Sequence, residues 1–176
     1  MKFLLTAAAA LGLMAGAASA QSRLETVQER GKLLCSGHNG SYLGFAEVDD
    51  QGNWEGLDID LCRGLAASLF GKAEGHLDIV PISWAQRWPA LQSGDIDVII
   101  KLSGWSQSRD TELNLAFSNP YFVAGFHVMT NADLGVESVA GLDGGSICVS
   151  AGTTTERFLA AYVEKLGIDV EIIVYC

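Results

Sequence analysis

The sequence predicts an α/β protein with mostly parallel strands, and two observations carry that prediction. Strand-like apolar runs alternate with helix-like runs over residues 32–100, which is the pattern of βαβ units. The order of strand, Gly/Thr turn, helix and strand then begins again after residue 130. We therefore expect two α/β lobes, formed by residues 21–124 and 131–176, with an extended segment at residues 125–130 between them.

The N-terminal residues 1–20 form a separate unit. Lys2 gives a short basic start, an apolar run rich in Leu and Ala follows, and Ala18-Ser-Ala20 is a small-x-small cleavage pattern. We interpret this segment as a secretory signal peptide removed after Ala20. The alternative is a membrane anchor, against which the flanks and the small residues argue. The net charge of −10 argues against nucleic acid and anionic membranes as primary partners.

The first lobe is expected to begin with a helix and a strand. Ser22 and Glu25 form a capping box, and Gly31 stops the helix. A strand is predicted over residues 32–35. Residues 36–44 are rich in Gly and Ser, and we expect a mobile loop that is too polar for the core. A short strand at residues 45–48 and a turn cluster at residues 49–53 then predict a small hairpin.

Two further strand–helix units complete the prediction for this lobe. Leucines recur every four residues at Leu61, Leu65 and Leu69, so a helix is expected from about Asp60 to Gly71. Strands are predicted over residues 77–81 and 95–100. Between them, a second capping box at residues 83–86 opens a helix that ends at Gly94, with Pro89 as a local conflict that should bend it.

Residues 102–121 contain the most informative stretch of the chain. Small polar residues surround a single Arg109, directly after an apolar strand. Loops at the carboxyl ends of strands are where open α/β sheets place ligands, and the planar guanidinium matches a carboxylate. The alternative for Arg109 is a solvated surface charge paired with Asp110 or Glu112.

The second lobe is expected to repeat the strand–helix–strand order. A loop with a short helix is predicted at residues 134–142, strands at 145–150 and 170–175, and a helix at 151–166 that Gly167 closes. Gly152-Thr-Thr-Thr-Glu156 places free backbone N–H groups and hydroxyls at the start of that helix. This is suited to a carboxylate or phosphate, and the alternative is an ordinary N-cap.

Aromatic residues near strand ends offer a second kind of ligand contact. Tyr42 and Trp84 both follow predicted strands, where rings can flank an aliphatic ligand, although core packing is the alternative. We identify no catalytic set among the Ser, His and acidic residues, and we expect no enzyme activity. The histidines are scattered and the cysteine spacings fit no zinc pattern, so we expect neither a metal nor a cofactor.

Five motifs occur in a specific order and spacing: Gly56-Leu-Asp-Ile-Asp-Leu61, Trp88-Pro-Ala-Leu-Gln-Ser-Gly-Asp-Ile-Asp-Val98, Ser108-Arg-Asp110, Leu115-Ala-Phe-Ser-Asn-Pro-Tyr121 and Gly152-Thr-Thr-Thr-Glu156. Through them the chain resembles the periplasmic solute-binding proteins of polar amino-acid ABC importers, family 3. It is most similar to the general L-amino-acid-binding branch. The resemblance covers essentially all of residues 30–175 and implies a type II periplasmic-binding-protein fold, with residues 125–130 as one strand of the hinge.

The resemblance also implies a set of ligand contacts. Arg109 would hold the α-carboxylate of an L-amino acid, and Thr153 and Thr154 would hold it from the second lobe. The backbone around Leu102 to Trp105 and the Ser103 hydroxyl would receive the head group, while Tyr42 and Trp84 would flank the stem. Gly104 departs from the family pattern of Ser or Thr, which puts one hydroxyl contact in doubt. Lys101 or Asn39 could meet a ligand side chain.

Family members continue well beyond the position of Cys176. We therefore expect the second lobe to be incomplete in this sequence and the chain by itself to bind amino acids weakly, while the full-length protein is expected to be a monomer. The leading hypothesis is a periplasmic carrier of L-amino acids, with broad specificity, that delivers them to an ABC permease. The alternatives are a dehydratase on the same fold and the sensing domain of a receptor.

The cysteines suggest a disulfide, because an exported chain reaches an oxidising compartment. Cys35 is placed at the end of the first predicted strand, and Cys62 lies on the apolar face of the helix expected to pack beside it. These two are the most plausible pair, and two buried free thiols are the alternative. Cys148 would then need a partner elsewhere.

Overall fold

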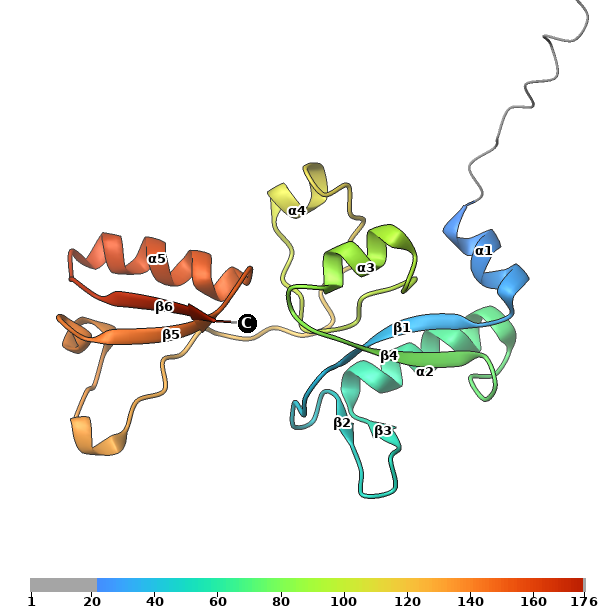
Figure 1. Cartoon of the computed structure of the whole chain (residues 1–176), viewed down its shortest axis with the longest axis horizontal. Helices are drawn as coiled ribbons and strands as arrows, with labels where there is room; N and C mark the ends of the chain where they lie inside the picture. The colour runs from blue at the N-terminus through green and yellow to red at the C-terminus, as the bar shows by residue number, and fades with distance from the viewer. Residues whose placement is uncertain (1–21, 176) are drawn as a thin grey trace, which may run out of the picture.

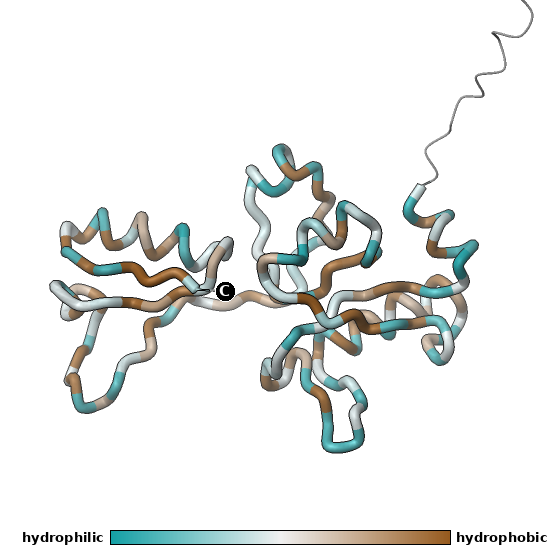
Figure 2. The backbone as a smooth tube through the Cα atoms, viewed as in Figure 1, coloured by the Kyte–Doolittle hydropathy of each residue, from teal (hydrophilic) through white to brown (hydrophobic). Residues whose placement is uncertain are grey.

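The computed structural model describes residues 22–175 and consists of two α/β units joined by a single crossing of the chain (Figure 1). The predicted signal peptide, residues 1–20, lies outside the described residues. Apolar residues concentrate along the strands of both units (Figure 2). None of the helices in the described part of the chain combines the length and apolar character needed to cross a membrane.

The first lobe is built on a parallel strand pair. β1 (Leu33–His38) pairs with β4 (Leu77–Ile82) in a register that runs from Leu33↔Leu77 to His38↔Ile82. The crossover helix α2 (Leu57–Phe70) packs on both strands. The core under this helix contains Val27, Leu33 and Ala66. Because the two strands are parallel, both end at the same edge of the sheet. The loops that face the second lobe follow the strands at this edge.

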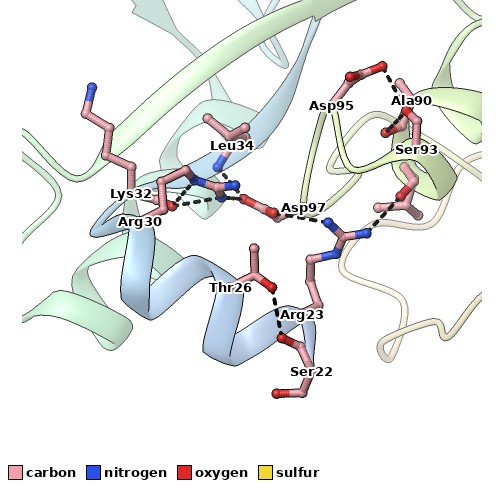
Figure 3. Close-up of polar contacts among 11 residues, drawn as sticks. Ser22, Arg23, Thr26, Arg30, Lys32, Leu34, Ala90, Ser93, Asp95 and Asp97 are labelled. Carbon is pink, nitrogen blue, oxygen red and sulfur yellow. Dashed lines mark hydrogen bonds and ion pairs between the residues drawn. The ribbon is translucent and has the colours of Figure 1, made fainter. Parts of the chain in front are cut away.

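The helix α1 (Arg23–Arg30) has the predicted capping box and ends at Gly31 in the left-handed conformation. It is fixed to the lobe by Asp97, whose side chain is almost fully buried (Figure 3). Arg30 donates to this carboxylate, Arg23 lies 3.8 Å from it, and the Leu34 N–H donates to it at 2.8 Å. A buried carboxylate is stable only with several charged or hydrogen-bonding partners. Through these partners Asp97 joins α1 and β1 to the segment of residues 95–100.

Among the smaller elements of this lobe, the hairpin and the helix that ends at Gly94 follow the prediction in type, whereas the short helix within residues 102–121 was not predicted. β2 (Glu47–Val48) and β3 (Trp54–Glu55) form the antiparallel hairpin. α3 (Arg87–Ser93) ends at Gly94 in the left-handed conformation, and α4 (Gln107–Thr111) is capped by the Ser106 side chain. Pro89 is the third residue of α3. First-turn residues have no intrahelical acceptor for their N–H, so the expected conflict at Pro89 does not arise.

The second lobe repeats the parallel arrangement. Two short 3₁₀ turns, η1 (Ala132–Leu134) and η2 (Val139–Leu142), precede β5 (Ser146–Ser150), α5 (Thr154–Leu166) and β6 (Glu171–Tyr175). β5 and β6 pair in parallel from Ser146↔Glu171 to Ser150↔Tyr175. Ile147, Val149 and Val163 are buried between strand and helix. Both strands again end toward the first lobe (Figure 1).

Three expectations about local structure were wrong. β1 runs on to His38, and Ser36 and His38 are buried rather than part of a polar loop. The strand expected over residues 95–100 is reduced to one bridge between Val98 and Cys35. α2 begins at Leu57, before the expected start near Asp60. Its N-cap residue, Gly56, has φ 113° and provides no side-chain cap. Residues 125–130 carry no assigned strand.

The structure contains the disulfide Cys35–Cys62, with a Cα–Cα separation of 6.1 Å. Both cysteines are fully buried between β1 and α2. The bridge therefore joins the first strand to the crossover helix at the centre of the first lobe. Within the described residues Cys148 is the unpaired cysteine, and it is exposed.

Candidate ligand-binding cavity

A cavity of about 370 Å³ lies between the two lobes. This is at the small end of the range of roughly 300–1,000 Å³ that is usual for small-molecule sites. All eight residues predicted to bind a ligand line it: Tyr42, Trp84, Leu102, Ser103, Gly104, Arg109, Thr153 and Thr154. The structure therefore brings these residues together from both lobes at the carboxyl ends of the strands, where ligands bind in α/β sheets.

Six further residues complete the wall: Arg87, Cys148, Val149, Ser150, Thr155 and Tyr175. Most of them come from the second lobe. Sequence patterns gave no reason to select Cys148, Val149 or Tyr175, because these residues belong to ordinary apolar strands and reach the cavity only through the contact between the lobes.

Arg109 is buried, with 8% of its surface exposed. Its Nη1 donates to the Gly104 carbonyl at 2.5 Å, and its Nη2 donates to the Gly152 carbonyl at 3.0 Å. The guanidinium also lies 4.9 Å from the ring centre of Trp88. Burial, and then the charge of Arg157, lower the pKa of Arg109. The alternative of a solvated surface pair with Asp110 or Glu112 is thus wrong.

Arg87 is a cavity residue that the sequence reasoning missed. It is 2% exposed and donates from Nη2 to the same Gly152 carbonyl at 3.0 Å. Its guanidinium lies 4.3 Å from the ring centre of Trp88. Arg87 is also the first residue of α3, where a cation opposes the helix dipole. That unfavourable position is the signal that could have identified it.

Lys101 supplies a third buried cation next to the cavity. Its Nζ lies 4.8 Å from the ring centre of Trp84 and 3.4 Å from the Gly37 carbonyl. Burial, and then the charge of Arg87, lower the pKa of Lys101 to about 8, while Asp58 opposes the shift. Burial and the charge of Arg109 lower the pKa of Arg87 to about 10. Burial thus lowers the pKa of all three side chains.

The charge of the cavity is opposite to that of the protein. Two arginines line it and Lys101 lies behind Trp84, whereas no Asp or Glu belongs to its wall within residues 22–175. The whole chain has a net charge of −10. Two guanidinium groups share one neutral backbone acceptor at Gly152. A ligand carboxylate is a stronger acceptor for both.

The aromatic wall is held in place by its own contacts. Trp84 Nε1 donates to the Tyr42 hydroxyl at 2.7 Å, and the two rings meet edge to face at 5.8 Å. The buried His38 ring packs against Tyr42 at 4.2 Å and against Trp84 at 5.6 Å. Tyr42 and Trp84 thus present fixed faces to the cavity. Asn39, which was considered as a contact for a ligand side chain, does not line it.

The start of α5 forms the opposite wall. The Thr153 hydroxyl accepts from the Glu156 N–H at 3.2 Å and donates to the Ser150 carbonyl at 2.8 Å. Glu156 in turn accepts from the Gly152 N–H at 2.7 Å. This is the ordinary N-cap that was the alternative at the level of sequence. The Thr153 hydroxyl is therefore used in hydrogen bonds within the second lobe. Thr154 and Thr155 remain at the cavity with first-turn N–H groups that have no partner within the helix.

The lobes touch at Gly104, where a side chain would be tightly placed. A Cβ added to Gly104 would meet the Thr154 side chain at 3.2 Å, which is tighter than ordinary contact. Arg157 of α5 also donates to the Ser108 hydroxyl at 3.0 Å. These contacts, together with the arginine bonds to Gly152, place the lobes against each other around the cavity.

Comparison with known proteins agrees with this geometry. Residues 34–166 match the bacterial extracellular solute-binding proteins, family 3. The chain belongs to this family. The glutamate/glutamine/aspartate/asparagine-binding protein BztA of Rhodobacter capsulatus is 44% identical over 150 residues, which cover 85% of this chain and 44% of BztA. The general L-amino acid-binding periplasmic protein AapJ of Rhizobium johnstonii is 38% identical over 168 residues, covering 96% of this chain and 48% of AapJ.

Solved structures of binding proteins share the fold. A periplasmic binding protein from Brucella ovis with glutathione bound superposes with a TM-score of 0.81 at 38% identity, over 88% of this chain and 48% of that one. The ancestral amino acid-binding protein AncCDT-1, a precursor of cyclohexadienyl dehydratase, gives a TM-score of 0.71 at 29% identity, over 88% of this chain and 66% of that one. The type II periplasmic-binding-protein fold predicted from the sequence is confirmed. The chain spans about half the length of the curated relatives that it matches.

Proposed function

We propose that this protein is a periplasmic carrier that captures L-amino acids between its two lobes and delivers them to an ABC transporter permease. In this proposal residues 21–124 form the first lobe, residues 125–130 belong to the hinge and residues 131–176 begin the second lobe. The observation that carries it is the buried Arg109, which lines the cavity and already donates hydrogen bonds toward both lobes.

The chemistry of the wall supports a ligand with a carboxylate. Arg109 would exchange its bond with the Gly152 carbonyl for a charge-assisted pair with the ligand, and Arg87 lies beside it with the same acceptor. Ser103 and the backbone of residues 102–104 are placed to receive the polar head group, and Tyr42 and Trp84 to flank the stem. Two relatives are named for binding polar or general amino acids, which agrees with broad specificity.

Lobe closure follows from the same contacts. A ligand that bonds to Arg109 on one side and to the start of α5 on the other binds the closed arrangement better than an open one, and so shifts the population toward it. The closed arrangement of the lobes would let a permease distinguish the loaded carrier from the empty one. Export to the periplasm is supported by the sequence of residues 1–20 and by the buried Cys35–Cys62 disulfide, since such bonds persist in oxidising compartments.

A ligand panel tests this proposal with the protein produced from its natural reading frame. L-Glutamate, L-glutamine, L-leucine and glutathione should stabilise it in a thermal-shift assay, by about 2.7 kcal/mol at a hundredfold excess over Kd. D-Glutamate and the decarboxylated amine 4-aminobutyrate should have little effect, because they misplace or lack the α-carboxylate. Stabilisation by a sugar or a metal ion in place of every amino acid would overturn the proposal.

The dehydratase alternative predicts turnover of a cyclic acid such as prephenate. Catalysis of that kind needs a positioned acid or base in the cleft, and the wall within residues 22–175 holds no carboxylate. Product formation from prephenate, followed by absorbance, would favour the enzyme over the carrier. The sensor alternative predicts a membrane-spanning segment and a signalling domain after the second lobe in the natural reading frame.

A further inference from the structure

A polar relay joins Asp58 and Tyr121, neither of which lines the cavity, to Leu102, which does. The Asp58 side chain is fully buried in the first turn of α2. Its Oδ1 accepts from the Tyr121 hydroxyl at 2.9 Å, and its Oδ2 lies 3.4 Å from His38 Nε2. The Tyr121 hydroxyl oxygen accepts in turn from the Leu102 N–H at 3.1 Å.

Leu102 has a backbone conformation that needs support. Its φ is 40°, and Leu102 and Asn114 are the non-glycine residues with positive φ among residues 22–175. A bulky residue in this region is strained relative to the ordinary conformations. Leu102, Ser103 and Gly104 line the cavity consecutively, so the unusual φ at Leu102 sets the direction in which the next two residues face.

We propose that Tyr121 is a positioning residue: its hydroxyl, oriented by Asp58, holds Leu102 in the left-handed conformation and so aims residues 102–104 at the ligand. This inference rests on the proposed amino-acid-binding function. Tyr121 does not belong to the cavity wall, and its hydroxyl is linked to that wall by the hydrogen bond from the Leu102 N–H.

The direction of the two hydrogen bonds follows from the chemistry of the groups. A phenol has one proton, and the Asp58 carboxylate is the stronger acceptor. The proton therefore points to Asp58, and a lone pair of the oxygen is left for the Leu102 N–H. Burial, and then the charge and hydrogen bond of Asp58, raise the pKa of Tyr121. The hydroxyl thus keeps its proton, and hydrogen-bond donation runs in one direction, from the Leu102 N–H of the binding loop through Tyr121 to Asp58 on α2.

The location of Tyr121 argues for positioning in preference to core packing. Its residue surface is 40% exposed, so its ring contributes less to the apolar core than a buried aromatic would. The hydroxyl, by contrast, joins three segments that are far apart in sequence: the start of α2, the binding loop and the beginning of the crossing to the second lobe. Removing only the oxygen breaks the bonds to Leu102 and Asp58 and keeps the ring.

The experiment compares Tyr121→Phe with a matched control, Tyr162→Phe, which removes the same atom from an exposed residue on α5. Hydrogen exchange of the peptide that covers residues 101–105 is measured by mass spectrometry, and titration calorimetry with L-glutamate and L-glutamine gives Kd. Loss of one hydrogen bond corresponds to roughly a two- to tenfold effect. We expect Tyr121→Phe to raise exchange at Leu102 and weaken both ligands by about fivefold, while Tyr162→Phe changes neither.

A second background separates positioning from general destabilisation. Glycine adopts positive φ without steric cost, so Leu102→Gly makes the support by Tyr121 unnecessary. Adding Tyr121→Phe to Leu102→Gly should therefore change Kd by less than about twofold, although Leu102→Gly itself removes a cavity side chain. An equal loss in both backgrounds, or unchanged exchange over residues 101–105 in Tyr121→Phe, would overturn the proposal. If the wild-type protein binds neither amino acid, the carrier proposal fails separately, and the exchange data still decide whether Tyr121 restrains Leu102.

Discussion

Replacing Arg109 with Ala removes the central cation of the cavity without touching the core of either lobe. Arg109 is buried at the contact between the lobes and donates to carbonyls on both sides. A charge-assisted hydrogen bond contributes about 1.5–3 kcal/mol, so a bidentate pair with a carboxylate contributes roughly 3–6 kcal/mol before the lost bonds to Gly104 and Gly152 are subtracted. A net loss near 3 kcal/mol corresponds to about a hundredfold in Kd.

Titration calorimetry with L-glutamate measures this loss in the protein from its natural reading frame. A micromolar ligand binds with about 8 kcal/mol, so Arg109→Ala should move Kd toward the millimolar range. Arg109→Lys keeps the charge but loses the planar fork, and we expect an intermediate Kd. The matched control is Arg63→Ala, which removes an exposed arginine paired with Asp60 on α2; its Kd should equal that of the wild type.

Folding must be checked separately, because Arg109 also joins the lobes. Circular dichroism and the midpoint of thermal unfolding should change little in Arg109→Ala, since removing a buried cation relieves a desolvation penalty while its two carbonyl partners lose a donor. An affinity within threefold of the wild type, in a folded Arg109→Ala protein, would refute the carboxylate role of Arg109.

Three further predictions concern charge and covalent structure. Arg87→Met should weaken L-glutamate by about tenfold and L-glutamine less, because it removes one positive charge from the cavity wall; competitive titration of the two ligands checks the difference. Burial lowers the pKa of Lys101 to about 8, below its unfolded value of about 10.4. Between these values the unfolded chain binds the extra proton, so the free energy of unfolding should rise with pH by up to about 1.4 kcal/mol per unit, and urea titrations from about pH 8 to 10 should show a rise that Lys101→Met lacks. The Cys35–Cys62 bridge spans 27 residues, and the chain-entropy relation gives about 3.5 kcal/mol for such a loop; the double alanine variant should lose about that much stability in urea, whereas Cys148→Ala should lose almost none.

Sequence patterns were sufficient for the parts of this protein in which a local signal determines a local structure. Ser22, Glu25 and Gly31 satisfy the ends of α1 by themselves, so its bounds followed from the residue types. The two strand–helix–strand units followed from hydrophobic period, because each element must bury one face. The eight residues predicted to bind a ligand all line one cavity, since parallel strands end at the same edge whatever the details of packing.

The local polar character of a segment was a poor guide to its burial. Ser36 and His38 looked like loop residues, but they are buried because β1 continues between β4 and the 96–100 segment, where Ser36 and His38 find hydrogen-bond partners on Ile100 and Asp58. Residues 95–100 looked like a strand, but within the described structure they make only one bridge: Asp97 and Val98 pair with the β1 backbone, whereas the Ile100 N–H donates to the Ser36 side chain. Such partners lie more than sixty residues apart for most of these bonds, so no local pattern encodes them.

The electrostatics of the cavity also depended on tertiary structure alone. The whole chain has a net charge of −10, yet Arg87 and Arg109 line one cavity, Lys101 lies against its Trp84, and the wall within residues 22–175 has no carboxylate. The role of Tyr121 arises in the same way, from a hydroxyl that reaches Asp58 and Leu102 at once. Residue types and their order determine which chemistry the chain possesses, whereas the packing of distant segments decides which charged and polar groups meet and what each of them can bind.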